Sequence, residues 1–322
     1  MAKLSKEAAK RHKQALDLVY SDKSLRLDDR YFILEHFHES ATNMNGLAGA
    51  FFTPEGLAND FSIEVPECES LIDLCAGIGR LAFACRERAK RIVCVEINPE
   101  YAEVGKRVLP EAEWIVNDVF SIPDMGRFST AISNPPFGSV KTGQAFDGRY
   151  TGASFEYKLI EAASKIADHG VFIIPQTSAP FRYSGQRSYS VEITRECEKF
   201  MSQTGIVLDH NCGLDTSAYK KEWHGVSPIC EIVLCDFNQD PAEIPAAPAE
   251  AEQNSVSKSV VAQPALIPPP APAQSEPSLA AVPDRAVASA PTAPARMKAS
   301  RKPDTGSANP QSFAQLSLFD AA

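Results

Sequence analysis

Apolar residues recur along the chain first at helical spacing and then in short runs separated by helices. Residues 5–20 and 28–40 carry apolar positions three and four residues apart, which predicts two helices. Runs that predict strands lie at 70–74, 92–97, 113–116, 130–133 and 171–175, and helical patterns lie at 80–89, 99–108 and 155–167. We expect Asp168-His169-Gly170 to end the last of these helices. Strands that alternate with helices of this length form a mostly parallel sheet that is covered on both faces.

Three further segments complete the predicted sheet. A helical pattern at 191–203 precedes apolar runs at 206–211 and 229–237. No helix is predicted between the last two runs, so we expect them to pair antiparallel at one edge. The pattern therefore predicts an α/β fold with a seven-stranded sheet, preceded by an N-terminal helical segment over residues 1–45.

Composition separates the end of the chain from the rest. Residues 241–322 hold 14 of the 24 prolines and two aromatic residues, Phe313 and Phe319. Such a segment buries too little apolar surface to offset the chain entropy that folding removes. We therefore predict one catalytic domain over 46–240, a disordered Pro/Ala-rich linker over 241–310 and a short terminal peptide over 311–322.

The charge of the chain limits the ways in which it could bind a polyanion. The formal net charge is −9, and the C-terminal segment contributes little of it. A protein that coats nucleic acid without specificity is expected to be basic. The charge disfavours that function but leaves room for a local basic groove.

The eight cysteines form no CxxC pair and no Cys/His cluster with zinc spacing. Most of them lie in or beside apolar runs, where reduced thiols pack as small hydrophobic groups. The start of the chain does not resemble a signal peptide, and no apolar run approaches the ~20 residues of a membrane span. We expect a cytoplasmic protein with no metal and no membrane partner.

A glycine-containing turn, Asp73-Leu74-Cys75-Ala76-Gly77-Ile78-Gly79, follows the first predicted strand and precedes a helix. Glycines allow a backbone to come close to a ligand. The turn lacks the full GxGxxG spacing, so a nicotinamide dinucleotide is not expected. Glu96 ends the second strand, where a carboxylate can accept both hydroxyls of a ribose, and Asp118 follows the third, where it can meet an adenine amine. Each acid alone is also a common turn residue.

The motif with the most specific chemistry, Asn134-Pro135-Pro136-Phe137, follows the fourth predicted strand. Two prolines fix the backbone and remove two amide donors, which leaves carbonyl groups free to accept. The Asn134 oxygen and a rigid carbonyl could accept both hydrogens of one amino group, while Phe137 stacks on a planar ring. Those contacts would free the delocalised lone pair of an aromatic amine to attack a methyl sulfonium. The alternative is a structural Pro-Pro turn.

These motifs, together with Phe51-Phe52-Thr53-Pro54, resemble in their order those of S-adenosylmethionine-dependent adenine-N6 DNA methyltransferases, over about residues 45–237. The resemblance implies a Rossmann-like class I methyltransferase fold, S-adenosylmethionine as cofactor and a flipped adenine in DNA as substrate. It implies catalytic roles for Asn134, Pro135, Pro136 and Phe137. It implies cofactor contacts from Phe52, Thr53, Pro54, Asp73, Cys75, Ala76, Gly77, Gly79, Glu96, Asp118 and Asn134.

No second globular region that could recognise a DNA sequence is predicted after the sheet, so we expect substrate contacts from loops that mix bases with aromatics. The predicted substrate-binding residues are Lys141, Arg149 and Tyr150 in 138–152, and Arg182, Tyr183 and Arg187 in 181–189. A third candidate segment, 215–224, contains Tyr219, Lys220, Lys221 and Trp223. Ordinary surface loops can have a similar composition.

The end of the chain resembles the peptide with which bacterial polymerases and repair proteins bind the replicative sliding clamp. The resemblance rests on Gln315, Leu316, Leu318 and Phe319 and implies the clamp as a partner. Apolar residues at the end of a long solvated linker are otherwise unexplained. The alternatives are a chance match or a strip that folds back on the domain.

Two other functions fit the same motifs. The same amine chemistry could act on RNA adenine or on a protein glutamine amide, although the glutamine enzymes more often have Tyr where this chain has Phe137. A noncatalytic DNA-associated or anti-restriction protein could also keep the fold, but the intact Asn134–Phe137 motif argues against it.

Overall fold

The computed structural model describes residues 4–38, 51–141 and 143–238. The predicted linker over 241–310 and the clamp-like peptide over 311–322 lie outside these residues, so both stay predictions. The structural description that follows concerns the first of two compact units of the chain, residues 1–251.

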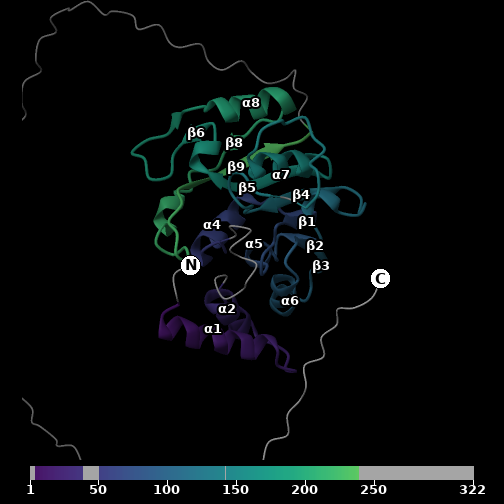
Figure 1. The fold of residues 1–322 in the computed structure, drawn as a ribbon, viewed down its shortest axis with the longest axis vertical. Helices are drawn as coiled ribbons and strands as arrows, with labels where there is room; N and C mark the ends of the chain where they lie inside the picture. Colours follow the sequence, from purple (N-terminus) through teal and green to yellow (C-terminus); the bar gives the residue numbers. More distant parts are fainter. Residues whose placement is uncertain (1–3, 39–50, 142, 239–322) are drawn as a thin grey trace, which may run out of the picture. The chain divides into compact units, whose positions relative to one another are not determined.

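One seven-stranded sheet, in the order β3-β2-β1-β4-β5-β9-β8, organises the described residues (Figure 1). Its strands are β1 Cys68–Leu74, β2 Ala89–Glu96, β3 Glu113–Val116, β4 Phe128–Ser133, β5 Ala167–Pro175, β8 Asp209–His210 and β9 Cys230–Asp236. Strands β1 to β5 are parallel, whereas β9 pairs antiparallel with both β5 and β8. The predicted fold class, a mostly parallel seven-stranded sheet with an antiparallel edge, is confirmed.

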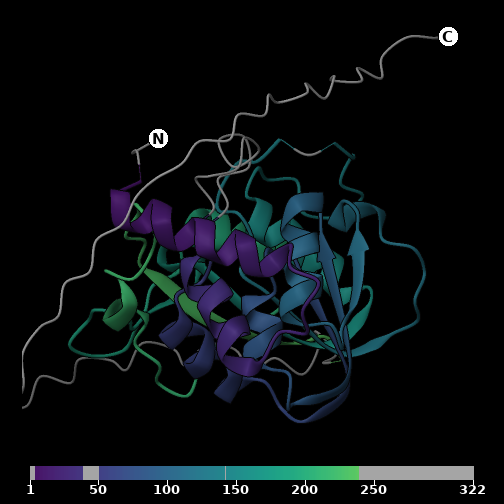
Figure 2. The same ribbon diagram turned by 90° about the horizontal axis from the view of Figure 1, so that it is seen from below.

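Helices cover both faces of the sheet because its strands are apolar on both sides. Leu71 and Ile132 belong to one core cluster and Ile72 and Ala131 to the other. The first cluster packs under α1 Lys6–Val19, α2 Leu27–His36, α4 Glu55–Glu64, α5 Arg80–Ala84 and α6 Pro99–Val108. The second packs under α7 Phe155–Ser164 and α8 Arg195–Thr204. Figure 2 shows α1 lying across the outer side of the first helical layer.

The structure corrects several predicted boundaries. The helix expected over 155–167 ends at Ser164, and Asp168-His169-Gly170 lie inside β5. A Cβ at Gly170 would lie 2.3 Å from the Phe172 ring, so this glycine permits close packing within the sheet rather than a turn. The helix expected over 80–89 ends at Ala84 because β2 starts five residues later and continues the pairing with β1.

Other differences lie at the edges of the fold. Helix α4 was not predicted, and the helix expected over 191–203 begins at Arg195. The run at 206–211 forms a strand only over Asp209–His210. Two short strands, β6 Phe181–Arg182 and β7 Ser190–Val191, form a separate antiparallel pair.

Arg107 on α6 joins the N-terminal helices to the sheet layers. Its guanidinium donates to the carbonyl oxygens of Val19 at 2.9 Å, Ser21 at 2.9 Å and Lys23 at 2.7 Å. Val19 ends α1, where carbonyls lack intrahelical partners and the helix dipole is negative, and Ser21 and Lys23 lie in the turn that follows. One cation therefore satisfies the end of α1 and holds it on α6.

We expect Arg107→Ala to lower the free energy of unfolding by about 1–3 kcal/mol, since three charge-assisted bonds to carbonyls are lost. Lys106→Ala is the matched control, because this exposed neighbour pairs only with the exposed Glu103 and such pairs contribute little. Urea denaturation followed by circular dichroism measures both. Equal midpoints for the two variants would contradict the role of Arg107.

Candidate functional site

Two adjoining cavities lie at the carboxyl ends of the central strands. The first cavity has a volume of about 250 Å³ and the second about 330 Å³. The first is lined by Phe51, Phe52, Thr53, Asp73, Cys75, Ala76, Gly77, Ile78, Arg80, Leu81, Glu96, Ile97, Asn98, Tyr101, Asp118, Val119, Asn134, Pro136, Val140, Lys141 and Phe155. The second is lined by Phe51, Asn134, Pro135, Phe137, Trp223, Val226, Ser227 and Pro228. Phe51 and Asn134 line both cavities and so form a shared wall.

The turn after β1 forms one wall of the first cavity. Cys75 and Gly77 adopt left-handed backbone angles, with φ of 64° and 58°. The Gly77 N–H donates to Glu96 at 2.7 Å, which ties the turn to the end of β2. Gly79 also has a positive φ, of 85°, but a Cβ there would meet the Trp114 ring at 3.0 Å. Gly79 therefore serves internal packing, and it does not line the cavity.

Nine of the eleven predicted cofactor residues line the first cavity, and Pro54 and Gly79 do not. Pro54 instead precedes α4 as its N-cap residue. The structure thus brings together the 51–53 segment, the turn after β1 and the three acids that were predicted from separate parts of the chain.

Two acids of the first cavity, Asp73 and Glu96, are buried and differ in their partners. Glu96 accepts backbone N–H groups from Gly77 and, at 2.8 Å, from Asn98, and burial raises the pKa of its carboxyl. Asp73 accepts the Ala82 N–H through Oδ2 at 3.2 Å, while its Oδ1 has no hydrogen-bond partner among the described residues. Burial raises the pKa of the Asp73 carboxyl well above its usual range.

Asp118 is a turn residue that also lines the first cavity. Its Oδ1 accepts the Phe120 N–H at 3.0 Å and caps the short helix η2, Val119–Ser121, while the residue also lines the first cavity. Ile97 and Val119 line the cavity as well, and Ile97 is 54% exposed. Acidic and apolar groups thus stand together where the carboxyl ends of β2 and β3 meet.

These residues fit S-adenosylmethionine. Glu96 could accept ribose hydroxyls, and Ile97 and Val119 offer apolar surface to a planar base beside the Asp118 carboxylate. A ligand that carries sulfonium and ammonium groups suits a cavity that is lined by Asp73, Glu96 and Asp118.

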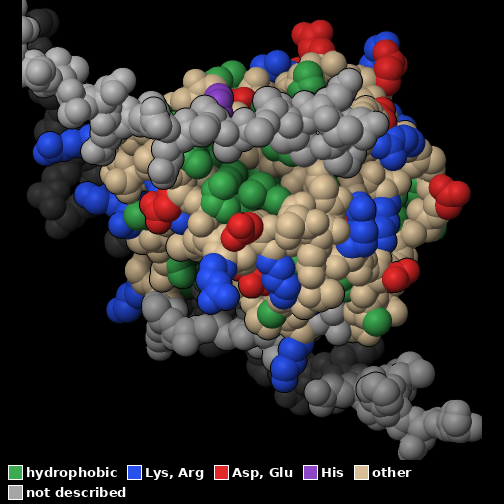
Figure 3. Space-filling model, turned by 90° about the horizontal axis from the view of Figure 1, so that it is seen from above, with side chains coloured by type: hydrophobic (Ala, Val, Ile, Leu, Met, Phe, Trp, Pro, Cys, Tyr) green, Lys and Arg blue, Asp and Glu red, His purple; other side chains and the backbone are tan. Residues whose placement is uncertain are grey.

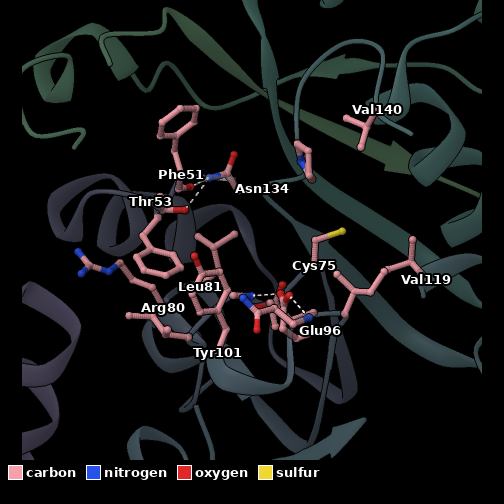
Figure 4. Close-up of a pocket in the computed structure, with 18 of the residues that line it drawn as sticks. Phe51, Thr53, Cys75, Arg80, Leu81, Glu96, Tyr101, Val119, Asn134 and Val140 are labelled. Carbon is pink, nitrogen blue, oxygen red and sulfur yellow. Dashed lines mark hydrogen bonds between the residues drawn. The ribbon is translucent and has the colours of Figure 1, made fainter. Parts of the chain in front are cut away.

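The Asn134 side chain is oriented by its contacts with the 51–53 segment (Figure 4). Its Nδ2 donates to Thr53 Oγ1 at 2.9 Å and to the Phe51 carbonyl at 3.3 Å. A carbonyl can only accept, so this contact identifies the NH2 end of the amide. The amide oxygen then points away from Thr53, where it can accept from a ligand at the shared wall.

The second cavity is apolar apart from Asn134, Ser227 and backbone groups. Pro135 and Phe137 line it opposite the loop that contains Trp223, whose side chain is 5% exposed. Among the described residues, none that lines this cavity has a titratable side chain. Trp223 fell in the third candidate segment, whereas Val226, Ser227 and Pro228 carried no recognisable signal.

The predicted substrate-binding residues do not gather in one place. Lys141 lines the first cavity, and none of the six lines the second. Tyr150 is buried between Tyr157 and Phe200, and its hydroxyl donates to Glu196 at 2.5 Å. Tyr150 is thus a core residue rather than part of a substrate surface.

Arg182 is also structural. Its guanidinium is buried and donates to the carbonyls of Gln176, Ala179 and Phe181. Arg149 and Arg187 are exposed and Tyr183 is half-buried, so any contact with a substrate stays a prediction for these three. On the face seen from above Figure 1, basic and acidic side chains are interspersed rather than gathered in one basic field (Figure 3).

The part of the chain that the structure describes contains neither a metal-binding cluster nor a disulfide bond. No group of three or more His, Cys, Asp or Glu there could hold a metal ion, and all eight cysteines are free thiols. Burial raises the thiol pKa of seven of them. Across the same residues, no helix combines the length and apolar character that a membrane crossing requires.

No protein-family profile and no curated protein matches the sequence. Several solved structures are similar to this chain in fold. A Listeria monocytogenes protein provisionally described as a class I S-adenosylmethionine-dependent methyltransferase is 11% identical, with a TM-score of 0.47 over 70% of this chain and 79% of that one. A Pyrococcus horikoshii protein provisionally described as an RNA methyltransferase is 20% identical, with a TM-score of 0.41 over 59% and 89%. At these identities the likeness is one of fold alone.

We expect S-adenosylmethionine binding to release protons at a pH where the Asp73 carboxyl is still partly protonated in the free protein, because a cationic ligand favours the ionised form of a carboxyl whose pKa is raised by burial. Calorimetry in two buffers with different ionisation enthalpies measures the number of protons released. Asp73→Asn should release fewer protons than the wild type. Identical wild-type heats in the two buffers would contradict the prediction.

Proposed function

We propose that this protein transfers the methyl group of S-adenosylmethionine to the exocyclic amine of adenine in DNA, with the target base flipped into the second cavity. The observation that carries the proposal is the shared wall, where Asn134 stands between the acidic first cavity and the apolar second cavity. A methyl donor and an amine acceptor bound in the two cavities would meet at this residue.

The position of the shared wall follows from the sheet. Strands β1 and β4 are parallel neighbours, and the Ser133 hydroxyl donates to the Leu74 carbonyl. The last residues of the two strands are therefore tied together, which sets the turn after β1 beside the Asn134–Phe137 bend. Because the chain crosses between β3 and β4, this edge is also a topological switch point, where open α/β sheets bind ligands.

The bend would supply hydrogen-bond acceptors for the amine in place of a catalytic general base. The Asn134 amide oxygen and the Pro135 carbonyl would accept the two hydrogens of the amine and draw the nitrogen toward tetrahedral geometry. Bound in the first cavity, S-adenosylmethionine would supply an electrophilic methyl group. The described residues that line the second cavity include no titratable side chain, so the surplus proton would leave to water after transfer.

The second cavity also limits the substrate. Phe137 and Trp223 present aromatic surface, and no charged side chain lines the cavity. Such walls favour a neutral planar ring that bears an amino group, and base–aromatic stacking contributes about 1–3 kcal/mol per base. The choice of DNA rests on the order of the motifs and on the clamp-like peptide, which would concentrate the enzyme at replicating DNA.

Expression in a bacterium that lacks DNA methylation tests the function. We expect direct sequencing of the chromosome to show N6-methyladenine at a recurring site, and none with Asn134→Ala. The variant should still bind S-adenosylmethionine, because most of the first cavity is unchanged. Methyl-adenine in RNA alone would overturn DNA as the substrate, and its absence from both would favour a noncatalytic role.

A second prediction concerns the orientation of the amide. Thr53→Val removes one acceptor of Asn134 Nδ2 while keeping the side-chain shape. We expect kcat to fall about tenfold, which corresponds to about 1.4 kcal/mol, whereas Thr53→Ser retains most of the activity. Steady-state rates measured at saturating cofactor and DNA give kcat. Equal rates for the Val and Ser variants would show that this bond does not orient the amide.

A further inference from the structure

The Asn134–Phe137 bend needs support from elsewhere in the chain, because its two prolines have no N–H group to donate. The support comes immediately after the bend. The Gly138 N–H donates to Glu156 Oε2 at 2.8 Å, and the Gly138 carbonyl accepts from the Phe155 N–H at 2.7 Å. Two bonds from the start of α7 thus fix the backbone where it leaves the bend.

Glu156 also reaches a second segment. Its Oε1 accepts the Ser178 hydroxyl at 2.8 Å, and Ser178 follows β5, the neighbour of β4 in the sheet. Glu156 is 2% exposed and Ser178 is 8% exposed. One buried carboxylate therefore holds the segments that follow two adjacent strands.

The partners of Glu156 indicate a geometric task. Its two described hydrogen-bond partners are neutral donors, and no described cation forms an ion pair with it. A carboxylate is costly to bury, and an apolar side chain would fill the same space at lower cost. The carboxylate instead offers two equivalent oxygens, one for each segment.

We propose that Glu156 is a positioning residue for methyl transfer, which sets the place of the Pro135 carbonyl and the Phe137 ring by holding the Gly138 N–H. This role rests on the function proposed above. Glu156 itself lines neither cavity and touches neither the cofactor nor the amine. It acts with Thr53, which holds the other end of the bend through Asn134.

Two substitutions at Glu156 distinguish its role in holding the bend from an effect of its negative charge. Glu156→Leu leaves the Gly138 N–H without an acceptor, so the bend is free to shift, and a misplacement of about 1 Å can lower a rate 10²-fold. Glu156→Gln keeps an oxygen for Gly138, and its NH2 group can donate to the Ser178 hydroxyl. We expect kcat to fall at least 30-fold in the Leu variant and to stay within about threefold in the Gln variant.

Glu161 on the same helix provides a matched control. It is also 2% exposed, and it accepts the backbone N–H groups of Arg149 at 2.6 Å and Tyr150 at 2.9 Å. These two residues line neither cavity. Glu161→Leu should therefore lower stability about as much as Glu156→Leu and leave kcat within about twofold of the wild type. Because Arg149 is a predicted DNA contact and pairs with Glu161 at 3.9 Å, any change in DNA binding is expected in KM.

The experiment measures kcat, the Kd for S-adenosylmethionine, the thermal midpoint and the hydrogen exchange of the Gly138 amide in all four proteins. The proposal expects a loss of kcat in Glu156→Leu with Kd within about threefold, and faster Gly138 exchange in that variant alone. Equal kcat in the two Leu variants, or unchanged Gly138 exchange in Glu156→Leu, would overturn it. An inactive wild type would overturn the proposed reaction, and Gly138 exchange would then decide alone whether Glu156 holds the bend.

Discussion

The chemistry of the site depends on the direction in which one side-chain amide points. Asn134 could present either its NH2 group or its oxygen to a ligand, and only the oxygen can accept from an amine. The Phe51 carbonyl makes that choice, because it must receive the NH2 end. Phe51 is distant from Asn134 in sequence, so the 51–53 segment sets the orientation of this amide in addition to lining the first cavity.

Proximity of the two cavities follows from sheet order rather than from the motifs themselves. The turn and the bend lie about 60 residues apart in the sequence, yet β1 and β4 are neighbours whose last residues are bonded through Ser133. Side chains at the ends of adjacent parallel strands then share one edge. A donor and an acceptor that bind at this edge need no further domain movement to meet.

The sequence was sufficient for the central elements and for much of the first cavity. Asp73, Glu96 and Asp118 could be predicted because each directly ends or follows an apolar run, so their common edge is a consequence of parallel strands. The role of Gly79 could not be predicted from the sequence. A glycine is needed there because a side chain would meet the ring of Trp114, which belongs to β3. The helix end predicted at Asp168-His169-Gly170 was wrong for a similar reason. Pairing of β5 with β4 and β9 places these residues in a strand and overrides the local turn signal.

Substrate contacts were harder to predict, since composition does not distinguish a basic aromatic loop from a packed one. Tyr150 and Arg182 look suited to a nucleic acid, but both are used by the core. Trp223, Val226 and Pro228 line the second cavity only because the loop before β9 returns to the edge of the sheet near Phe51. That return is a tertiary feature with no local pattern.

The buried acids show how a ligand site can be separated from a structural one. Glu156, Glu161 and Glu231 each accept bonds on both carboxylate oxygens, largely from backbone N–H groups, and such acids hold loops in place. Asp73 is equally buried, yet one of its oxygens has no partner among the described residues and it lines a cavity. A buried polar atom is costly when it is left unsatisfied, so the missing partner is expected to be a ligand. Asp73 lies at the same edge of the sheet as the Asn134 amide, because β1 and β4 are parallel neighbours.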